Sequence, residues 1–209
     1  MALGRRRGPE TARRGTPSDY LVVGLGNPGR EYAGTRHNAG AAALEVLAER
    51  SDERLKASKD AAALVAEARF GQARVVLAIP TTYMNDSGRA VAPLCRRYGI
   101  DDPALVIIVH DELDLPPGTV KVKAGGGLAG NNGLRSVSAH LHTNDFLRVR
   151  IGVGKPPGGA ERGVDHVLSR PGAAERELLG VAVVEAADAV ERIVSEGVDA
   201  AMAEVNRRR

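Results

Sequence analysis

The chain has 209 residues, of which 43% are hydrophobic and only 3% aromatic, a composition that indicates one globular domain with a core of aliphatic side chains. No apolar run approaches the ~18 residues that a membrane span requires, which excludes a membrane-spanning class. The single cysteine, Cys95, excludes an internal disulfide framework. It fits a protein of a reducing compartment, and we expect a cytoplasmic one.

The positive charge lies at the start of the chain. The whole chain carries a formal net charge of +3, and residues 1–19, with five arginines against Glu10 and Asp19, already account for it. Residues 20–209 therefore sum to zero. The bulk charge gives no evidence for nucleic-acid binding, and only local patches can supply it.

Residues 1–19 are rich in Arg, Gly, Pro and Thr and show no periodicity. This composition predicts a disordered basic extension that precedes a folded domain at residues 20–209. An organellar transit peptide is an alternative interpretation of the arginines, which the acidic Glu10 and Asp19 oppose. The segment lacks the apolar region of a secretory signal peptide.

Strands and helices alternate beyond this extension. Apolar runs predict strands at residues 21–25, 61–70, 73–79, 104–109, 119–123 and 146–153. Helical periodicity predicts helices at residues 38–50, 87–98, 132–141, 173–195 and 199–205. The alternation favours a single three-layer α/β domain, in which helices flank a twisted mixed β-sheet.

Three loops follow apolar strands in the same sense along the chain. They carry Asn27, Asn85 and Asp111, respectively. If the three strands are parallel, these loops lie beyond one carboxyl edge of the sheet, where α/β proteins bind their ligands. The sequence therefore predicts a single site built from all three loops.

The first of these loops contains a glycine pattern, GLGNPG at residues 24–29, that matches the dinucleotide-binding fingerprint. That fingerprint requires a helix that begins at once, so that its amino end faces the pyrophosphate. Here Pro28 and a polar run delay the helix to about residue 37. We therefore expect the glycines to form a tight turn that lets a substrate approach the backbone.

His37 and Asp111 are the candidate catalytic pair. A histidine near a helix start is usually structural, but Asp111 follows a strand that is apolar on both faces and so lies at the rim of the core. An aspartate there can accept a hydrogen bond from the imidazole and fix its tautomer. In the alternative interpretation, Asp111 caps a turn in the loop at residues 111–118. His110 points to the other side of the strand and is the weaker partner.

The chain offers no obvious side-chain nucleophile. No GxSxG elbow is present, and Cys95 lies in a helical pattern typical of packing. The histidines are scattered, without the spacing of a metal site, and we expect neither metal nor cofactor. A His–Asp pair without a nucleophile suggests general-base activation of water. Asn85 then supplies a neutral donor to a carbonyl or oxyanion, or else caps a turn before Ser87.

Basic residues alternate along two predicted strands. Lys121 and Lys123 share one face, and Arg148 and Arg150 share another. Neighbours on one face are about 7 Å apart, close to the phosphate spacing of a nucleic-acid strand. The alternative is an ordinary solvated face of a sheet. Between these strands lies the glycine-rich loop at residues 125–133, whose amides and Asn132 suit a phosphate or a bound water.

Together these segments resemble the bacterial-type peptidyl-tRNA hydrolases. The matching patterns are GLGNPG..Y..TRHN.G at residues 24–40, P.T.MN.SG at 80–88, HDELDLPPG at 110–118, K.GGG..G.NGL at 123–134 and F.R.RIG at 146–152. The resemblance covers residues 21–157 and weakens toward the C-terminus. Several patterns in the right order make it highly specific.

The resemblance implies a phosphorylase/hydrolase-like fold and a monomeric, metal-independent enzyme that hydrolyses the ester between a peptide and the 3′ end of tRNA. It implies that His37 is the general base, that Asp111 orients it and that Asn85 binds the substrate and polarises the ester. Further site residues are implied by position: Asn27 and Asn132 for the peptide backbone, the 3′ end or the attacking water, Tyr32 and Tyr83 for the lining of the site, and Lys123 and Arg150 for the 5′-phosphate of the acceptor stem.

The chain departs from the family pattern at two positions. The family usually has His where this chain has Asn131, and Gly where it has Ala129. The first change puts an auxiliary histidine in doubt, whereas neither change touches His37 or Asp111. A non-enzymatic RNA-binding module on the same fold is the rival function, and retention of the matched site residues favours the enzyme.

Overall fold

A computed structural model describes residues 17–156 and 162–207 of the chain. Most of the predicted extension, residues 1–16, lies outside the described residues. Its last residues do not behave as an extension. The amide of Ser18 donates to the carbonyl of Tyr98 at 3.0 Å, and that of Asp19 donates to the carbonyl of Arg74 at 2.8 Å. Ser18 and Asp19 therefore belong to the folded body.

The structure has a seven-stranded mixed sheet in the order β2-β3-β4-β1-β5-β7-β6. Strands β4, β1, β5 and β7 are parallel, whereas β2, β3 and β6 run antiparallel to their neighbours. The strand bounds are β1 Tyr20–Gly24, β2 Lys56–Ala57, β3 Ala63–Phe70, β4 Ala73–Pro80, β5 Val106–Glu112, β6 Val120–Ala124 and β7 Leu147–Gly152. The predicted mixed sheet is confirmed, with the short β2 as an addition.

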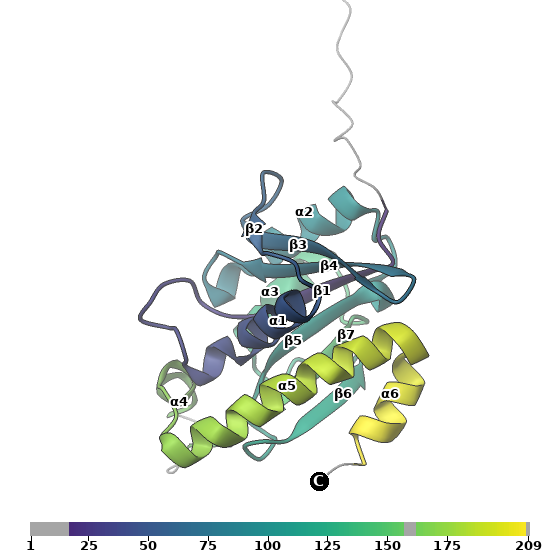
Figure 1. Cartoon of the computed structure of the whole chain (residues 1–209). Coiled ribbons are helices and arrows are strands. Elements are labelled where there is room, and N and C mark those ends of the chain that lie inside the picture. The colour runs from purple at the N-terminus through teal and green to yellow at the C-terminus, as the bar shows by residue number, and fades with distance from the viewer. Residues whose placement is uncertain (1–16, 157–161, 208–209) are drawn as a thin grey trace, which may run out of the picture.

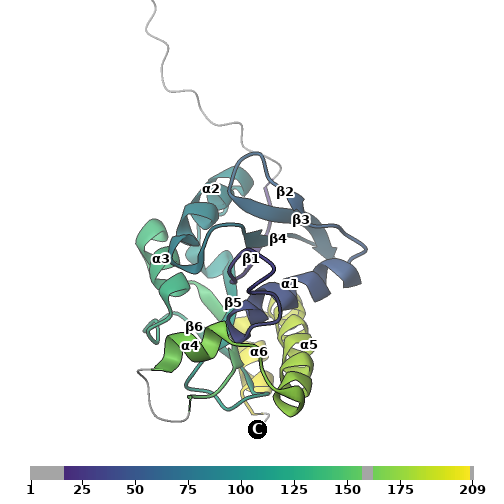
Figure 2. The ribbon, with the colours of Figure 1, turned by 90° about the vertical axis from the view of Figure 1, so that its left-hand side faces the viewer.

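Helices cover both faces of the sheet and make three layers. Figure 1 shows α1, α5 and α6 on the face toward the viewer, and in Figure 2 the sheet separates them from α2 and α3. The helix bounds are α1 Ala39–Arg50, α2 Gly88–Tyr98, α3 Asn132–Leu141, α4 Gly163–Leu168, α5 Ala173–Glu196 and α6 Val198–Val205. Three 3₁₀ turns complete the set, η1 Arg36–Asn38, η2 Met84–Asp86 and η3 Pro103–Leu105.

Each face of the sheet has its own apolar core, because side chains alternate between the faces along every strand. In β5, Ile107 and Val109 pack with α1 and α5, whereas Val106 and Ile108 pack with α2 and α3. The three-layer prediction is confirmed. None of the helices described at residues 17–156 and 162–207 combines the length and the apolar character needed to cross a bilayer.

Helix α1 approaches the sheet closely at its amino end. A Cβ atom on Gly40 would lie 2.2 Å from the carbonyl oxygen of Val109, and one on Gly24 would lie 2.3 Å from the carbonyl oxygen of Gly40. Only glycine fits at these contacts. The role that we expected for Gly24, a turn open to substrate, is wrong, because Gly24 seats the helix on β1 and thereby brings η1 close to β5.

Strand β5 is longer than its apolar run predicts. It continues through His110, Asp111 and Glu112, which the sequence placed in a loop, and pairs with β7 up to Gly152. All seven residues of the strand are buried. Polar residues can extend this strand because two of the three side chains have ionic partners, Asp111 with His37 and Glu112 with Arg150.

Candidate active site

The carboxyl ends of three adjacent parallel strands meet at one edge of the sheet. Strand β1 lies between β4 and β5 and is parallel to both. The segments that follow β1 and β4 and the last residues of β5 carry Asn27, Asn85 and Asp111. The predicted convergence of three segments at one edge is thus confirmed, with Asp111 on the strand itself.

His37 and Asp111 form a direct pair. The Nδ1 atom of His37 lies 2.9 Å from both Oδ1 and Oδ2 of Asp111. The Asp111 side chain is only 2% exposed, whereas that of His37 is 13% exposed. The alternative role of Asp111 as a turn cap is not supported, since both of its oxygens face the imidazole.

The partner of Nδ1 sets the tautomer of His37. An ionised carboxylate can only accept hydrogen bonds, so the proton of the neutral imidazole lies on Nδ1, which donates to Asp111. The other ring nitrogen, Nε2, is then an unprotonated acceptor. Within the part of the chain that the structure describes, Nε2 makes no hydrogen bond. This arrangement leaves an unprotonated ring nitrogen at the edge of the sheet.

Asn27 ties two of the site segments together. Its side-chain Oδ1 accepts a hydrogen bond from the amide of Met84 at 2.8 Å, which fixes the start of η2. Its backbone amide donates to Oδ1 of Asn38 at 2.9 Å, and its carbonyl accepts from Nδ2 of Asn38 at 3.0 Å. The Nδ2 group of Asn27 has no partner among residues 17–156 and 162–207. That amide remains free to donate.

Asn85 and two tyrosines lie on the segments that follow β4 and β1. Asn85 lies on η2 and is exposed, and its amide makes no hydrogen bond to a described residue. The rings of Tyr32 and Tyr83 meet edge to face, with their centroids 6.3 Å apart and an angle of 84°. Tyr83 remains 58% exposed. The predicted lining residues thus come together from the β1 and β4 loops.

The glycine-rich loop leads into α3, and both departures from the family pattern lie there. Asn131 is the N-cap of α3, and its Oδ1 accepts from the amide of Leu134 at 3.1 Å. Asparagine is among the best residues for this role. Ala129 has a φ of 48°, in the left-handed region that favours the glycine usual in the family. The neighbouring Asn132 is exposed and accepts a bond from Arg135 at 3.3 Å.

The four basic residues of β6 and β7 share one face, because Lys121 pairs with Arg150 and Lys123 with Arg148 across the strands. This face is not simply solvated. Arg148 is 1% exposed and donates to the carbonyls of Gly127, at 2.6 Å, and Gly125. The alternative of an ordinary solvated face is therefore wrong for Arg148, which holds the glycine-rich loop.

The remaining cations differ in their partners. Lys121 donates from Nζ to the carbonyl of Asn206 at 2.8 Å. Arg150 approaches Glu112 at 3.8 Å and is partly exposed. The half-buried Lys123 makes no ion pair with the residues described by the structure. Lys123 and Arg150 are diagonal neighbours on one face, as the resemblance implies for a phosphate site.

Two further titratable groups lie buried. His110 is fully buried on the other face of the sheet, its Nδ1 donates to the carbonyl of Asp111 at 2.6 Å, and burial lowers its pKa to about 4. Cys95 lies on α2 and packs in the core between this helix and the sheet, where burial raises the pKa of its thiol to about 11. At neutral pH both groups are uncharged. The interpretations of His110 as the weaker partner and of Cys95 as a packing residue are supported.

Two residues beside His37 have roles that the sequence did not reveal. Asn38 bridges to Asn27, and Arg36 reaches the segment around α4. Both were visible in the sequence as polar residues on either side of the candidate base. That placement is the only signal that could have identified them, since each acts through a segment distant in the sequence.

A three-layer α/β fold with a carboxylate-held imidazole at the carboxyl edge of its sheet is an arrangement that suits a hydrolase. A sequence model of the family "Peptidyl-tRNA hydrolase" matches residues 21–209. The chain belongs to the peptidyl-tRNA hydrolase family, and the resemblance drawn from its sequence patterns is confirmed.

Curated relatives and solved structures agree with this assignment. The peptidyl-tRNA hydrolase of Mycolicibacterium vanbaalenii is 50% identical over 181 residues, which cover 87% of this chain and 93% of that protein. The peptidyl-tRNA hydrolase of Nocardia farcinica is 51% identical with the same coverage. The crystal structure of peptidyl-tRNA hydrolase from Acinetobacter baumannii superposes with a TM-score of 0.84 at 41% identity, covering 92% of this chain and 97% of that one.

Proposed function

We propose that this protein hydrolyses the ester between the peptide and the 3′ end of tRNA in peptidyl-tRNA, with His37 as the general base. One observation carries the assignment of the base. The Nδ1 atom of His37 lies 2.9 Å from both oxygens of the buried Asp111, which leaves Nε2 as an unpaired acceptor. A neutral imidazole held in one tautomer is suited to taking a proton from water.

The proposed reaction uses this geometry. Nε2 of His37 accepts a proton from a water molecule as the water oxygen attacks the ester carbonyl. Asp111 stabilises the imidazolium that forms. The amide of Asn85 donates to the oxyanion of the tetrahedral intermediate. When the intermediate collapses, the ester C–O bond breaks and the ribose oxygen takes the proton from His37, which releases free tRNA and the peptide acid.

Other residues bind the substrate away from the reacting bond. We assign the peptide backbone and the 3′ end of the tRNA to the amides of Asn27 and Asn132, and the lining of the site to the Tyr32–Tyr83 pair. Lys123 and Arg150, on one face of β6 and β7, bind the 5′-phosphate of the acceptor stem. Phosphate contacts of this kind position a nucleic acid without reading its sequence.

The assembly and setting are part of the same proposal. The enzyme works as a cytoplasmic monomer without metal or cofactor. Among the described residues, no group of three His, Cys, Asp or Glu side chains is placed to hold a metal ion. The rival function, a non-enzymatic RNA-binding module, is not favoured, since relatives about 50% identical are named peptidyl-tRNA hydrolases.

Release of tRNA from an N-blocked aminoacyl-tRNA tests the proposal. The wild-type protein should release tRNA, and His37→Ala should lower kcat by at least ~100-fold, the scale expected of a general base. His140→Ala, an exposed histidine of α3, is the matched control and should keep full activity. No release by wild-type protein at micromolar concentration would refute the enzyme, and a loss below about tenfold in His37→Ala would refute this base.

A further inference from the structure

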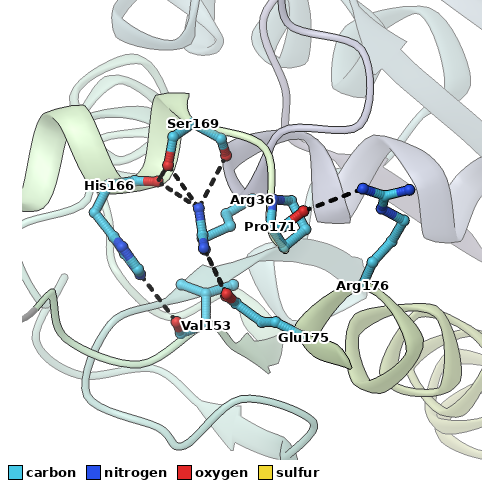
Figure 3. Close-up of polar contacts among 7 residues, drawn as sticks. All are labelled: Arg36, Val153, His166, Ser169, Pro171, Glu175 and Arg176. Carbon is cyan, nitrogen blue, oxygen red and sulfur yellow. Dashed lines mark hydrogen bonds and ion pairs between the residues drawn. The ribbon is translucent and has the colours of Figure 1, made fainter. Parts of the chain in front are cut away.

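Arg36, the residue before the proposed base, is a charged side chain that is only 7% exposed. Its guanidinium forms a bidentate ion pair with Glu175, with Nε–Oε1 and Nη2–Oε2 distances of 2.5 Å. Its Nη1 donates to the carbonyls of His166 and Ser169, both at 3.1 Å, and to Oγ of Ser169 at 2.6 Å. Figure 3 shows Arg36 surrounded by these partners.

These partners belong to one segment, residues 162–176, which we call the α4 strap. It comprises α4 and the start of α5. The strap has a second attachment outside η1, where Arg170 donates to the carbonyls of Ala33 and Arg30 at 2.9 and 3.3 Å. A further bond joins the strap to the residue that follows β7, since Nε2 of His166 donates to the carbonyl of Val153 at 3.1 Å. Arg36 is therefore not the sole support of the strap.

The geometry of η1 gives Arg36 a role beyond that support. Successive side chains of a 3₁₀ helix diverge by about 120°. Arg36, His37 and Asn38 each reach a different segment: the α4 strap, β5 and the β1 loop. The turn has only three residues and no side-chain cap. It continues directly into α1 at Ala39, and the backbone amide of Arg36 donates to the carbonyl of Ser169 at 3.3 Å, so the side-chain contacts of η1 add to the support that its backbone receives. The backbone that carries His37 is fixed from both sides by its neighbours.

We propose that Arg36 is a positioning residue, which fixes the orientation of η1 so that His37 Nδ1 stays on Asp111 and Nε2 stays directed at the water. It acts through His37 and contacts neither the substrate nor the reacting atoms. The inference rests on the proposed function, because it assigns Arg36 a role toward the proposed base. A misplacement of about 1 Å in a catalytic group costs on the order of 100-fold in rate.

Steady-state kinetics on N-blocked aminoacyl-tRNA test this role. Arg36→Gln should lower kcat by about 10- to 100-fold, with KM unchanged within about twofold. Arg36→Lys keeps the charge but loses the planar fork, so it should recover little of the loss. Arg170→Ala is the matched control, because it loosens the same strap without touching η1. It should keep kcat within about twofold of wild type.

The tautomer of His37 provides a second measurement. It should change in Arg36→Gln if Arg36 positions His37, and it should not change if Arg36 only stabilises the fold. Histidine side-chain ¹H–¹⁵N spectra of wild-type protein should show the proton of His37 on Nδ1, and folded Arg36→Gln should show a mixture of tautomers. If Arg36→Gln does not fold, Glu175→Gln replaces it, since that variant removes the bidentate partner and leaves the bonds of Arg36 to the strap carbonyls.

The outcomes separate the two proposals. A wild-type kcat in folded Arg36→Gln, or an effect confined to KM, would overturn the positioning role of Arg36. If His37→Ala is inactive in the same assay, the proposal that His37 is the base still stands. An active His37→Ala would overturn the base itself. A lowered kcat in Arg36→Gln with a single wild-type tautomer of His37 would also overturn the positioning role. Equal losses in Arg36→Gln and Arg170→Ala would assign the effect to the strap instead.

Discussion

The two ends of the proposed site differ in how firmly their side chains are fixed by neighbouring residues. At the end assigned to chemistry, His37 lies 2.9 Å from both oxygens of a buried carboxylate, and its neighbours in η1 are bound on both sides. At the end assigned to the tRNA, Arg150 has one acidic neighbour at 3.8 Å, and the partly exposed Lys123 has no ion pair within the described residues.

This difference matches the physical demands of the two tasks. Proton transfer requires hydrogen-bond reach and the right tautomer, so a small misplacement is costly. Attraction between a cation and a phosphate falls off gradually with distance and tolerates mobile side chains. We therefore expect substitutions at the first end to act on kcat and those at the second end to act on KM.

Asp111→Ala should have the largest effect, lowering kcat by at least ~100-fold, because the imidazole loses both its orientation and the charge that stabilises it. Paired groups act as a unit, so the double variant with His37→Ala should be no slower than His37→Ala alone, within about threefold. Single-turnover release of tRNA measures this. Simple additivity of the two losses would show that Asp111 works independently of His37.

Arg150→Ala should raise KM by about tenfold and leave kcat nearly unchanged, the loss expected for one hydrogen bond to a charged group. The dependence of log KM on log salt should become shallower by about one unit, because one phosphate contact is lost. Initial rates at several salt concentrations measure both quantities.

Arg69→Ala is the control for this prediction. Arg69 is exposed on β3, toward the opposite edge of the sheet, and its removal changes the net charge equally. Its KM and salt slope should match the wild type within about twofold. An Arg150→Ala effect confined to kcat would contradict the difference between the two ends.

The sequence was sufficient for the part of this comparison that depends on local patterns. Apolar runs and helical periodicity placed each principal strand and helix, and the parallel sense of three strands placed Asn27, Asn85 and Asp111 at one edge. The His37–Asp111 pair followed, because an aspartate at the end of a doubly buried strand is at the rim of the core. These inferences needed no knowledge of contacts between distant segments.

The features that the sequence missed depend on such contacts. Helix α4 has six residues and few helix signals, and Arg36 binds the segment from 130 residues away in the sequence. Strand β5 extends through Asp111 because its polar residues find partners on η1 and β7. From its sequence pattern Arg148 could belong to a solvated face, but in the structure it is buried and donates to the glycine-rich loop. Partners of this kind cannot be predicted from periodicity.

Lowering the pH should weaken the ion pair between Arg36 and Glu175, which helps to fix η1 at the end of the site assigned to chemistry. The hydrogen bond from Arg36 holds the pKa of the Glu175 carboxyl below its usual range. Since the folded pKa is depressed, the pair contributes its full stability above the unfolded pKa of about 4.3, and this contribution is lost as pH falls through the folded value. Between pH 6 and 3, urea midpoints of wild-type protein should fall more steeply than those of Glu175→Gln.

Glu177→Gln is the control for this experiment, because Glu177 is an exposed residue on the same helix with no ion pair among the described residues. Its midpoints should run parallel to those of wild type. Parallel curves for Glu175→Gln as well would show that the Arg36–Glu175 pair does not stabilise the fold. The positioning role of Arg36 would then rest on its bonds to the strap carbonyls.

The smallest effect is expected at Ala129, in the loop that Arg148 holds at the tRNA end. A left-handed φ costs alanine roughly 1 kcal/mol relative to glycine, and the greater freedom of glycine in the unfolded chain offsets about half of that. Ala129→Gly should therefore raise the free energy of unfolding by about 0.5 kcal/mol, a gain of about 1–2 °C in Tm. Ala139→Gly, at an exposed position of α3, should instead lower it by about 1 kcal/mol. Equal losses in the two variants would show that the backbone at Ala129 is not strained, and that the departure from glycine in this loop carries no cost.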